Sequence, residues 1–221
     1  MENMEITKNR RIDAILFDFG GVFTASPFTA IDAAGAELGV PLSQFAQIMF
    51  GPYDEDTDHP WHRLERGEIT IHDAAEKIRN LGLDQGLDFD PLKVLFSIGA
   101  GDGEQNPLVD RVRQLKRDRY QTAIITNNIA EFRDFWRALI PVDELFDLVV
   151  DSSIEGIRKP DPEIFRLALS RLGDIPPERS VFLDDYETNV KAAVSLGIHG
   201  ILVGEDKQKA VQELDKTLAD G

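Results

Sequence analysis

The sequence of 221 residues contains no cysteine. This excludes disulfide bonds, thiolate nucleophiles and cysteine-ligated zinc or iron–sulfur centres, and it agrees with the reducing cytoplasm, which we expect to be the location of the protein. Basic residues are scarce, since 24 Lys and Arg stand against 40 Asp and Glu and the formal net charge is −16. A chain this acidic is repelled by phosphate backbones, so we expect no nucleic acid as a partner.

Long hydrophobic runs are missing as well. Apolar stretches such as residues 14–17 are far shorter than the roughly 18 residues that a membrane span needs. Residues 1–11 are charged, unlike the apolar centre of a signal peptide, and we expect no membrane partner. Hydrophobic residues nevertheless make up 42% of the chain, which is enough to bury the core of one large domain or of a domain with a smaller insertion.

Five short apolar runs predict buried strands that end at polar or glycine turns, at residues 14–17, 123–125, 148–150, 181–183 and 201–203. Between them, apolar residues recur at helical spacing, as at Leu108, Val112 and Leu115. Strands that alternate with helices imply right-handed crossovers and a parallel sheet. We therefore predict an α/β fold with a doubly wound, Rossmann-like parallel sheet.

One interval is too long for a single crossover helix, because about eighty residues separate the first strand from the helix near Pro107. It has helical spacing, as at Ile31, Ala34 and Leu38, with helix breaks expected at Gly51 and Gly82. We predict a small helical cap at residues 24–104, inserted into a core of residues 1–23 and 105–221. A final helix is expected over residues 206–220.

Polar side chains follow the predicted strands at their carboxyl ends, where open α/β sheets bind ligands. Asp18 follows the first strand, Thr126 and Asn127 follow the second, and Asp184 and Asp185 follow the fourth. For each residue alone, turn chemistry is the simpler explanation, and their convergence is what favours a site. Three carboxylates in one crevice favour Mg²⁺, a hard cation with oxygen ligands that leaves positions for a substrate phosphate.

A lysine lies in the same predicted region. Pro160 and Pro162 predict a stiff, extended loop around Lys159, before a helix that Asp161 caps. A fixed ammonium at this point can pair with a carboxylate nucleophile and with transferring phosphoryl oxygens. A solvated loop lysine is the alternative.

Four segments, in this order, resemble the four motifs of the haloacid dehalogenase (HAD) superfamily. They are residues 18–22, 125–128, 158–162 and 182–189. The resemblance covers essentially the whole chain. Because the fourth motif has the form Asp-Asp-x-x-x-Asn, the chain is most similar to members with a helical cap and phosphatase activity, such as the amino-terminal phosphatase domain of soluble epoxide hydrolase.

The resemblance implies a hydrolase of a small phosphorylated compound that works through a phosphoaspartyl intermediate. Asp18 would be the nucleophile, and Lys159 would orient it and offset its charge. Thr126 and the backbone amide of Asn127 would hold the phosphoryl oxygens.

The resemblance also implies Mg²⁺ as the cofactor. Asp18, the backbone carbonyl of Gly20 and Asp185 would bind the ion, while Asp184 and Asn189 would act behind these ligands or through water. The oligomeric state leaves no signal in the sequence.

The chain departs from the family pattern at Gly20. Most phosphatases of this family carry a second Asp there, which protonates the leaving alcohol and then activates water. Positioned proton transfer contributes about 10²–10⁴-fold, so turnover of alkyl phosphates should suffer. The sequence leaves three alternatives open: a phosphatase that needs little protonation or borrows an acid from the cap, a catalytically impaired binding or regulatory protein, and a 2-haloacid dehalogenase.

Part of the predicted cap bears on these alternatives. Residues 54–59 are rich in Asp and Glu and could supply an acid, although a solvated acidic loop is the simpler interpretation. His59 and His62 lack a third metal ligand in register, so we expect surface or packing residues. By the resemblance, residues 61–68 lie near the substrate and would contribute to specificity.

Overall fold

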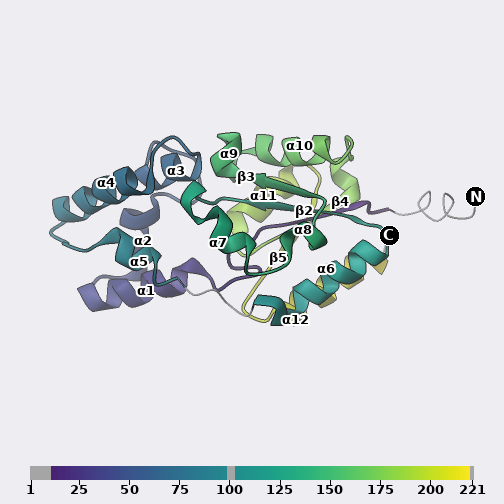
Figure 1. Ribbon diagram of the computed structural model, residues 1–221, viewed down its shortest axis with the longest axis horizontal. Helices are drawn as coiled ribbons and strands as arrows, with labels where there is room; N and C mark the ends of the chain where they lie inside the picture. The colour runs from purple at the N-terminus through teal and green to yellow at the C-terminus, as the bar shows by residue number, and fades with distance from the viewer. Residues whose placement is uncertain (1–10, 99–102, 220–221) are drawn as a thin grey trace, which may run out of the picture.

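The computed structural model describes residues 11–98 and 103–219. Five parallel strands form one sheet in the order β3-β2-β1-β4-β5 (Figure 1). The strands are β1 (Ala14–Phe17), β2 (Gln121–Thr126), β3 (Leu148–Asp151), β4 (Ser180–Asp184) and β5 (His199–Leu202). The predicted doubly wound α/β fold is confirmed.

The fifth strand is displaced from its predicted position at residues 201–203. It begins at His199, because His199 and Gly200 pair with Val181 and Phe182 of β4. A histidine and a glycine hide this start from a search for apolar runs. The amide of Val203 still donates a hydrogen bond to Asp184 O (2.9 Å), just beyond the end of β5.

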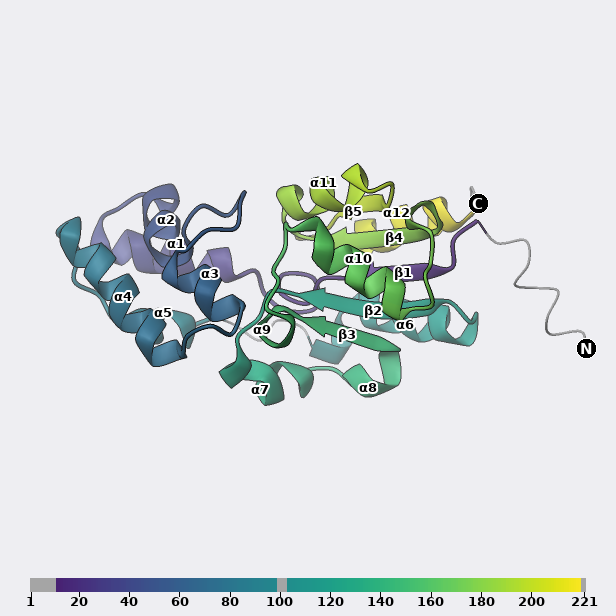
Figure 2. The ribbon, with the colours of Figure 1, turned by 90° about the horizontal axis from the view of Figure 1, so that it is seen from above.

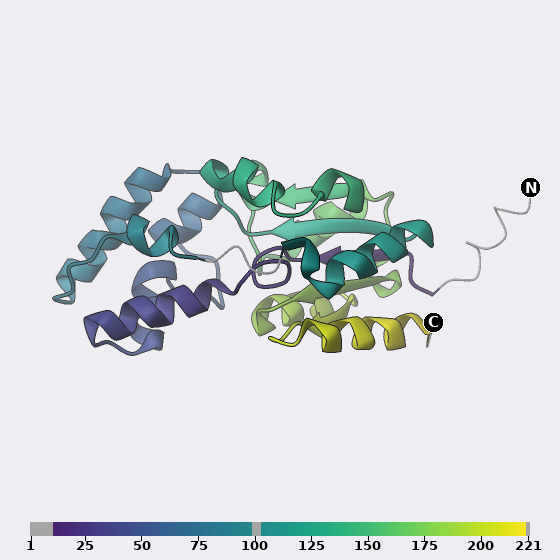
Figure 3. The ribbon, with the colours of Figure 1, turned by 60° about the horizontal axis from the view of Figure 1, so that its bottom comes forward.

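Helices cover both faces of the sheet and thereby bury its strands on both sides. On one face, β1 contributes Ile15 and Phe17 to a core with α6 (Pro107–Arg117), α7 (Arg133–Arg137), α8 (Val142–Leu145) and α12 (Lys207–Ala219). On the other face, Ala14 and Leu16 pack with α10 (Pro162–Arg171) and α11 (Glu187–Ser195). Figure 1 shows α6 and α12 below the sheet, and in Figure 3 α6 (teal) lies in front of the strands with α12 (yellow) next to it. The short helix α9 (Ser152–Glu155) follows β3.

Several helix boundaries agree with the predicted caps. Asp161 accepts a hydrogen bond from the Glu163 amide (2.9 Å), with Pro162 as the first residue of α10. The final helix α12 ends at Ala219, and Asp220 lies outside the described residues. No helix in residues 11–98 and 103–219 is both long and apolar enough to cross a bilayer.

Five α-helices lie between β1 and α6 in the part of this interval that the structure describes, together with the short 3-10 helix Gly103–Gln105. The five α-helices are α1 (Pro27–Leu38), α2 (Leu42–Phe50), α3 (Pro60–Glu65), α4 (Ile71–Asp84) and α5 (Pro91–Leu95), together called the helical unit below. They share a core of their own, which includes Ile31, Phe45 and Ile78. Figure 2 shows the helical unit at one end of the molecule, with the strand arrows pointing towards it. The cap boundaries at 24 and 104 stay a prediction, and residues 99–102 of the predicted cap lie outside the described residues.

The helix break expected at Gly82 is wrong, because α4 continues to Asp84. Close packing explains why residue 82 is a glycine. A Cβ at position 82 would lie 2.6 Å from Phe89 Cε1 and 2.9 Å from Leu87 O. Gly51 does end α2, with a positive φ of 75°.

This contact makes Gly82→Ala a test of the packing. In an unpacked helix, Ala for Gly stabilises by about 1 kcal/mol. Here we expect the free energy of unfolding to fall by about 1–3 kcal/mol, because Phe89 and the Leu87 carbonyl must move. Urea unfolding measures the change. The exposed neighbour Asn80→Ala should cost nothing, and stabilisation by Gly82→Ala would contradict the observed packing.

Candidate active site

Three carboxylates meet at the carboxyl edge of the sheet. Asp18 follows β1, Asp184 ends the adjacent β4, and Asp185 comes next. One ligand oxygen from each lies within 4.8 Å of the others. The Asp18 amide donates to Leu183 O (2.8 Å), which fixes its backbone to β4. At Gly21 a Cβ would lie 1.9 Å from Asp185 Oδ2, so only glycine permits this approach.

Lys159 joins two of these carboxylates. Its Nζ lies 2.8 Å from Asp18 Oδ1 and 2.7 Å from Asp184 Oδ2, and its side chain is 1% exposed. Burial alone disfavours the charged form, but Asp18 and Asp184 outweigh burial and raise the pKa of Lys159. The lysine is therefore a buried, permanently charged ammonium, and the alternative of a solvated loop lysine is wrong.

Asp184 is held from several sides. Asn189 Nδ2 donates to both of its carboxylate oxygens, at 3.2 and 3.1 Å. The amide of Tyr186 donates to Asp184 Oδ1 at 2.7 Å. These donors and Lys159 fix the carboxylate, whereas Asp185 faces the pocket described below.

The Asn127 side chain holds the backbone of Lys159 in place, a role that the sequence did not indicate. Its Oδ1 accepts a hydrogen bond from the Lys159 amide (2.8 Å), and its Nδ2 donates one to the Lys159 carbonyl (3.0 Å). The extended loop predicted there is wrong, because the Asp161 amide donates to Arg158 O (3.0 Å) and closes a tight turn. The turn and the two hydrogen bonds with Asn127 together aim Lys159 at the carboxylates.

Thr126, the last residue of β2, is 1% exposed. Its hydroxyl is buried and has no hydrogen-bond partner among the described residues. Leaving a buried hydroxyl unpaired costs free energy, so a ligand oxygen that reached it would stabilise it. Thr126 is not among the residues that line the cavity described next.

A cavity of about 150 Å³ opens above the carboxylates. The core contributes Asp18, Gly20, Asn127, Lys159 and Asp185 to its lining, and the helical unit contributes Phe50, Tyr53, Trp61 and Glu65. Trp61 and Glu65 belong to the 61–68 stretch predicted to lie near a substrate. A Cβ at Gly20 would meet no atom within 4 Å, so space for a side chain remains there.

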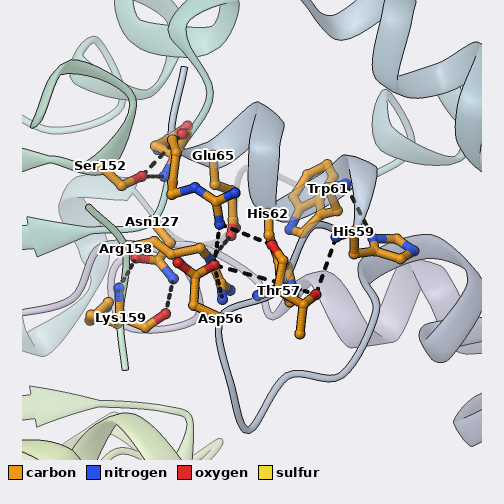
Figure 4. A network of polar contacts seen from close by, with 12 residues as sticks. Asp56, Thr57, His59, Trp61, His62, Glu65, Asn127, Ser152, Arg158 and Lys159 are labelled. Atoms are coloured by element: carbon orange, nitrogen blue, oxygen red, sulfur yellow. Dashed lines mark hydrogen bonds and ion pairs between the residues drawn. The ribbon is translucent and has the colours of Figure 1, made fainter. Parts of the chain in front are cut away.

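The sequence did not reveal a buried ion pair that joins the core to the helical unit (Figure 4). The Arg158 side chain is fully buried, and its Nε donates to Glu65 Oε2 of α3 at 2.7 Å. Burial raises the pKa of Glu65, and Arg158 opposes this rise. The only sequence signal was the position of Arg158 in the third motif, next to Lys159.

The acidic segment, residues 54–59, is not simply the solvated loop that the sequence analysis favoured. Asp56 pairs with Arg66, and Asp54 accepts a hydrogen bond from the Tyr186 hydroxyl (3.0 Å), so these two residues have specific partners. His59 and His62 are packing residues, as expected. Burial lowers the pKa of His59 to about 4 and that of His62 to about 3.

The charges in the site suit a divalent cation. Three carboxylates and one ammonium sum to −3 + 1 = −2. Without a cation, burial raises the pKa of Asp18 to about 8, with Lys159 opposing and Asp184 and Asp185 adding to the rise. Burial and Asp184 raise the pKa of Asp185 to about 6. Oxygen donors in a site that carries a charge of −2 once its carboxylates are ionised fit Mg²⁺.

Sequence comparison identifies relatives of the chain. A family model for haloacid dehalogenase-like hydrolases matches residues 12–197. Mouse acyl-CoA dehydrogenase family member 10 is 35% identical over 213 residues, covering 95% of this chain and 19% of that protein. Flavin mononucleotide hydrolase 1 of Arabidopsis thaliana is 28% identical, covering 89% and 74%. Pig bifunctional epoxide hydrolase 2 is 30% identical, covering 92% and 38%. The chain thus spans about a fifth of the mouse protein and less than half of the pig protein.

Structure comparison finds the same fold in an HAD-family enzyme from Bacteroides thetaiotaomicron, solved with magnesium and inorganic phosphate. It is 21% identical with a TM-score of 0.62, covering 88% of this chain and 96% of the other.

The raised carboxylate pKa values predict an unusual pH dependence of stability. With EDTA present, folded Asp18 and Asp185 hold protons that the unfolded chain, with an Asp pKa of roughly 3.9, has lost. Because the folded state binds more protons, the free energy of unfolding should fall as the pH rises from 5 to 8.

Asp18→Asn should make the decrease in the free energy of unfolding smaller above pH 6. In the wild type, added Mg²⁺ should make the free energy of unfolding rise with pH instead. Urea unfolding at pH 5, 6.5 and 8 measures the slope. Asp84→Asn, at an exposed helix end, should keep the wild-type slope. If Asp18→Asn left the pH dependence of the free energy of unfolding unchanged, the attribution of that dependence to the raised pKa of Asp18 would be wrong.

Proposed function

Because the chain belongs to the haloacid dehalogenase-like hydrolases, we propose that it is a Mg²⁺-dependent phosphatase of small phosphorylated compounds, with Asp18 as the nucleophile. One observation carries the proposal: Lys159 Nζ contacts Asp18 and Asp184 at once, beside the pocket-lining Asp185. This arrangement supplies a nucleophile, a fixed cation and an oxygen donor set at one edge of the sheet. The flavin mononucleotide hydrolase among the relatives supports phosphoester chemistry.

In the proposed reaction, an Asp18 carboxylate oxygen attacks phosphorus while the bond from phosphorus to the leaving oxygen breaks. Because Gly20 offers no acid, the leaving oxygen takes its proton from water and is released as the alcohol. Lys159 orients Asp18 and opposes the rise in its pKa that burial causes. The unpaired Thr126 hydroxyl and the backbone amide of Asn127 would donate to phosphoryl oxygens. Water then cleaves the phosphoaspartate, which releases phosphate and regenerates Asp18.

Mg²⁺, when bound, would neutralise charge on the phosphoryl oxygens. We assign its ligands as Asp18, the Gly20 carbonyl and Asp185. Asp184 and Asn189 would act behind them, since Asn189 and Lys159 already hold Asp184 in place.

A carboxylate cluster of this kind is the observation that favours the phosphatase over a 2-haloacid dehalogenase. A dehalogenase needs only one attacking carboxylate and no cation to neutralise an anionic phosphoryl group. Here three carboxylates share the site with one lysine, and the net charge of −2 needs a cation before an anionic substrate can approach.

The first test is phosphate release from p-nitrophenyl phosphate with Mg²⁺. We expect Asp18→Asn to lower kcat by about 10³-fold or more, because the nucleophile is lost, and EDTA to abolish turnover. Asp84→Asn serves as the control variant and should retain activity.

Two results would contradict the proposal. Phosphate binding in the presence of Mg²⁺ without turnover would indicate the impaired, binding relative. Halide release from a 2-haloacid without added metal would indicate the dehalogenase.

The empty space at Gly20 gives a gain-of-function prediction. Gly20→Asp can be accommodated, because its Cβ meets no atom within 4 Å, and it restores the acid found in most phosphatases of the family. We expect kcat/KM for simple sugar phosphates to rise by about 10²–10⁴-fold, and that for p-nitrophenyl phosphate to rise less, because phenolate needs little protonation.

Gly20→Asn is the matched control, since it has the same size but cannot transfer a proton. Equal rates for Gly20→Asp and Gly20→Asn would mean that another group already protonates the leaving alcohol.

A further inference from the structure

A second cavity, of about 660 Å³, adjoins the cavity of about 150 Å³ that Asp18 and Asp185 line, which we call the catalytic pocket. The two share six lining residues: Gly20, Thr24, Leu95, Ile98, Asn128 and Phe132. One wall comes from the helical unit around α5, and the other comes from α7 and the turn Ala130–Phe132 (η4) of the core. A group bonded to a phosphate above Asp18 can therefore extend into this second cavity.

The lining of the second cavity is predominantly apolar. Four aromatic residues of the lining pack in pairs: Phe96 and Phe132 have ring centroids 5.5 Å apart, and Phe19 and Trp136 have ring centroids 4.5 Å apart. Phe96 is 69% exposed and Phe135 is 60% exposed. Rings of this size are costly to leave in water, and a volume of 300–1,000 Å³ is typical of ligand pockets.

The charges of this cavity select against polar anions. Neither Lys nor Arg is found among its described lining residues, whose ionisable side chains are His72 and Glu131. Glu131 already accepts a hydrogen bond from the Ile71 amide at the start of α4 (2.8 Å). A second phosphate or a carboxylate on the substrate would find no cation there.

The other sides of the catalytic pocket are less suitable for a bulky group. Phe28, Phe50, Tyr53 and Tyr186 fill one side by packing on one another, with ring centroids 4.7–6.1 Å apart. A third cavity, beside Asp185, is lined by polar side chains that include Asp32, Asn106, Glu205 and Lys207. Of the three cavities described here, the second is therefore the one best suited to a bulky apolar group of the substrate.

We propose that the second cavity binds the organic part of the substrate, and that the enzyme prefers phosphomonoesters of apolar alcohols to sugar phosphates and nucleotides. The inference rests on the proposed function, since the phosphoryl group would lie at Asp18. Hydrolysis then consumes water and releases inorganic phosphate and an apolar alcohol.

The test is a series of monoalkyl phosphates from ethyl to octyl, used below their micelle concentrations with Mg²⁺. We expect KM to fall about threefold for each methylene that is buried, with kcat nearly constant. A sugar phosphate of similar size should bind like ethyl phosphate. No dependence of KM on chain length would overturn the inference.

The double variant Phe96→Ser and Phe135→Ser removes exposed rings that line this cavity alone among the three described here. It should abolish most of the dependence of KM on chain length, because octyl phosphate loses the apolar surface that these rings supply. The matched control is Leu83→Ser with Val194→Ser, at residues that are 47% and 51% exposed and line none of the three cavities. This control should keep the full dependence.

Binding separates this inference from the proposed function. Calorimetry with Asp18→Asn, Mg²⁺ and octyl phosphate, against inorganic phosphate as the baseline, needs no turnover. Tighter octyl phosphate binding that the Phe96 and Phe135 substitutions remove supports the cavity even if p-nitrophenyl phosphate is not hydrolysed. If these substitutions instead dissociate a dimer in sedimentation and leave octyl phosphate binding unchanged, the surface is a self-association site and the inference is overturned.

Discussion

The buried ammonium of Lys159 is the interaction on which the candidate site depends. It lies within 2.8 Å of Asp18 and 2.7 Å of Asp184, which come from different strands. Removing a charged lysine from water is costly unless charged partners surround it, and clustered carboxylates are equally costly without a cation. Each group therefore makes the burial of the other possible. With Asp185 and with all three carboxylates ionised, the summed charge is −2, which is the reason we propose a divalent cation there.

The loop that carries Lys159 also ties the core to the helical unit. Asn127 holds the backbone of Lys159 with two hydrogen bonds, and the preceding Arg158 reaches Glu65 of α3. Removing one partner of a buried ion pair leaves an uncompensated charge, so Arg158 and Glu65 keep this loop and α3 in a fixed relation. The ion pair thus joins α3, whose Trp61 and Glu65 line the catalytic pocket, to the residue next to Lys159.

The sequence was most informative where one local pattern determines the structure. Apolar runs located the strands, and the polar residues after them predicted the convergence of Asp18, Asp184 and Asp185, because parallel strands place their carboxyl ends at one edge. It failed where tertiary contacts decide. Gly82 lies inside α4 because of Phe89, and Asn127 turns its side chain to the backbone of Lys159. The partner of Arg158 lies 93 residues away, and no local pattern indicates such a pair.

Gly20 and the apolar cavity bear on the same chemical question, the nature of the leaving group. An enzyme without a positioned acid loses most on alcohols that leave poorly, so it depends more on binding to hold the ester in a reactive position. Gly20 lines both the catalytic pocket and the apolar cavity, and no atom lies within 4 Å of where its Cβ would be. A side chain at this position would lie beside both cavities. Under our two proposals, glycine at position 20 therefore supplies no proton donor and leaves space next to the surface that would bind the apolar group.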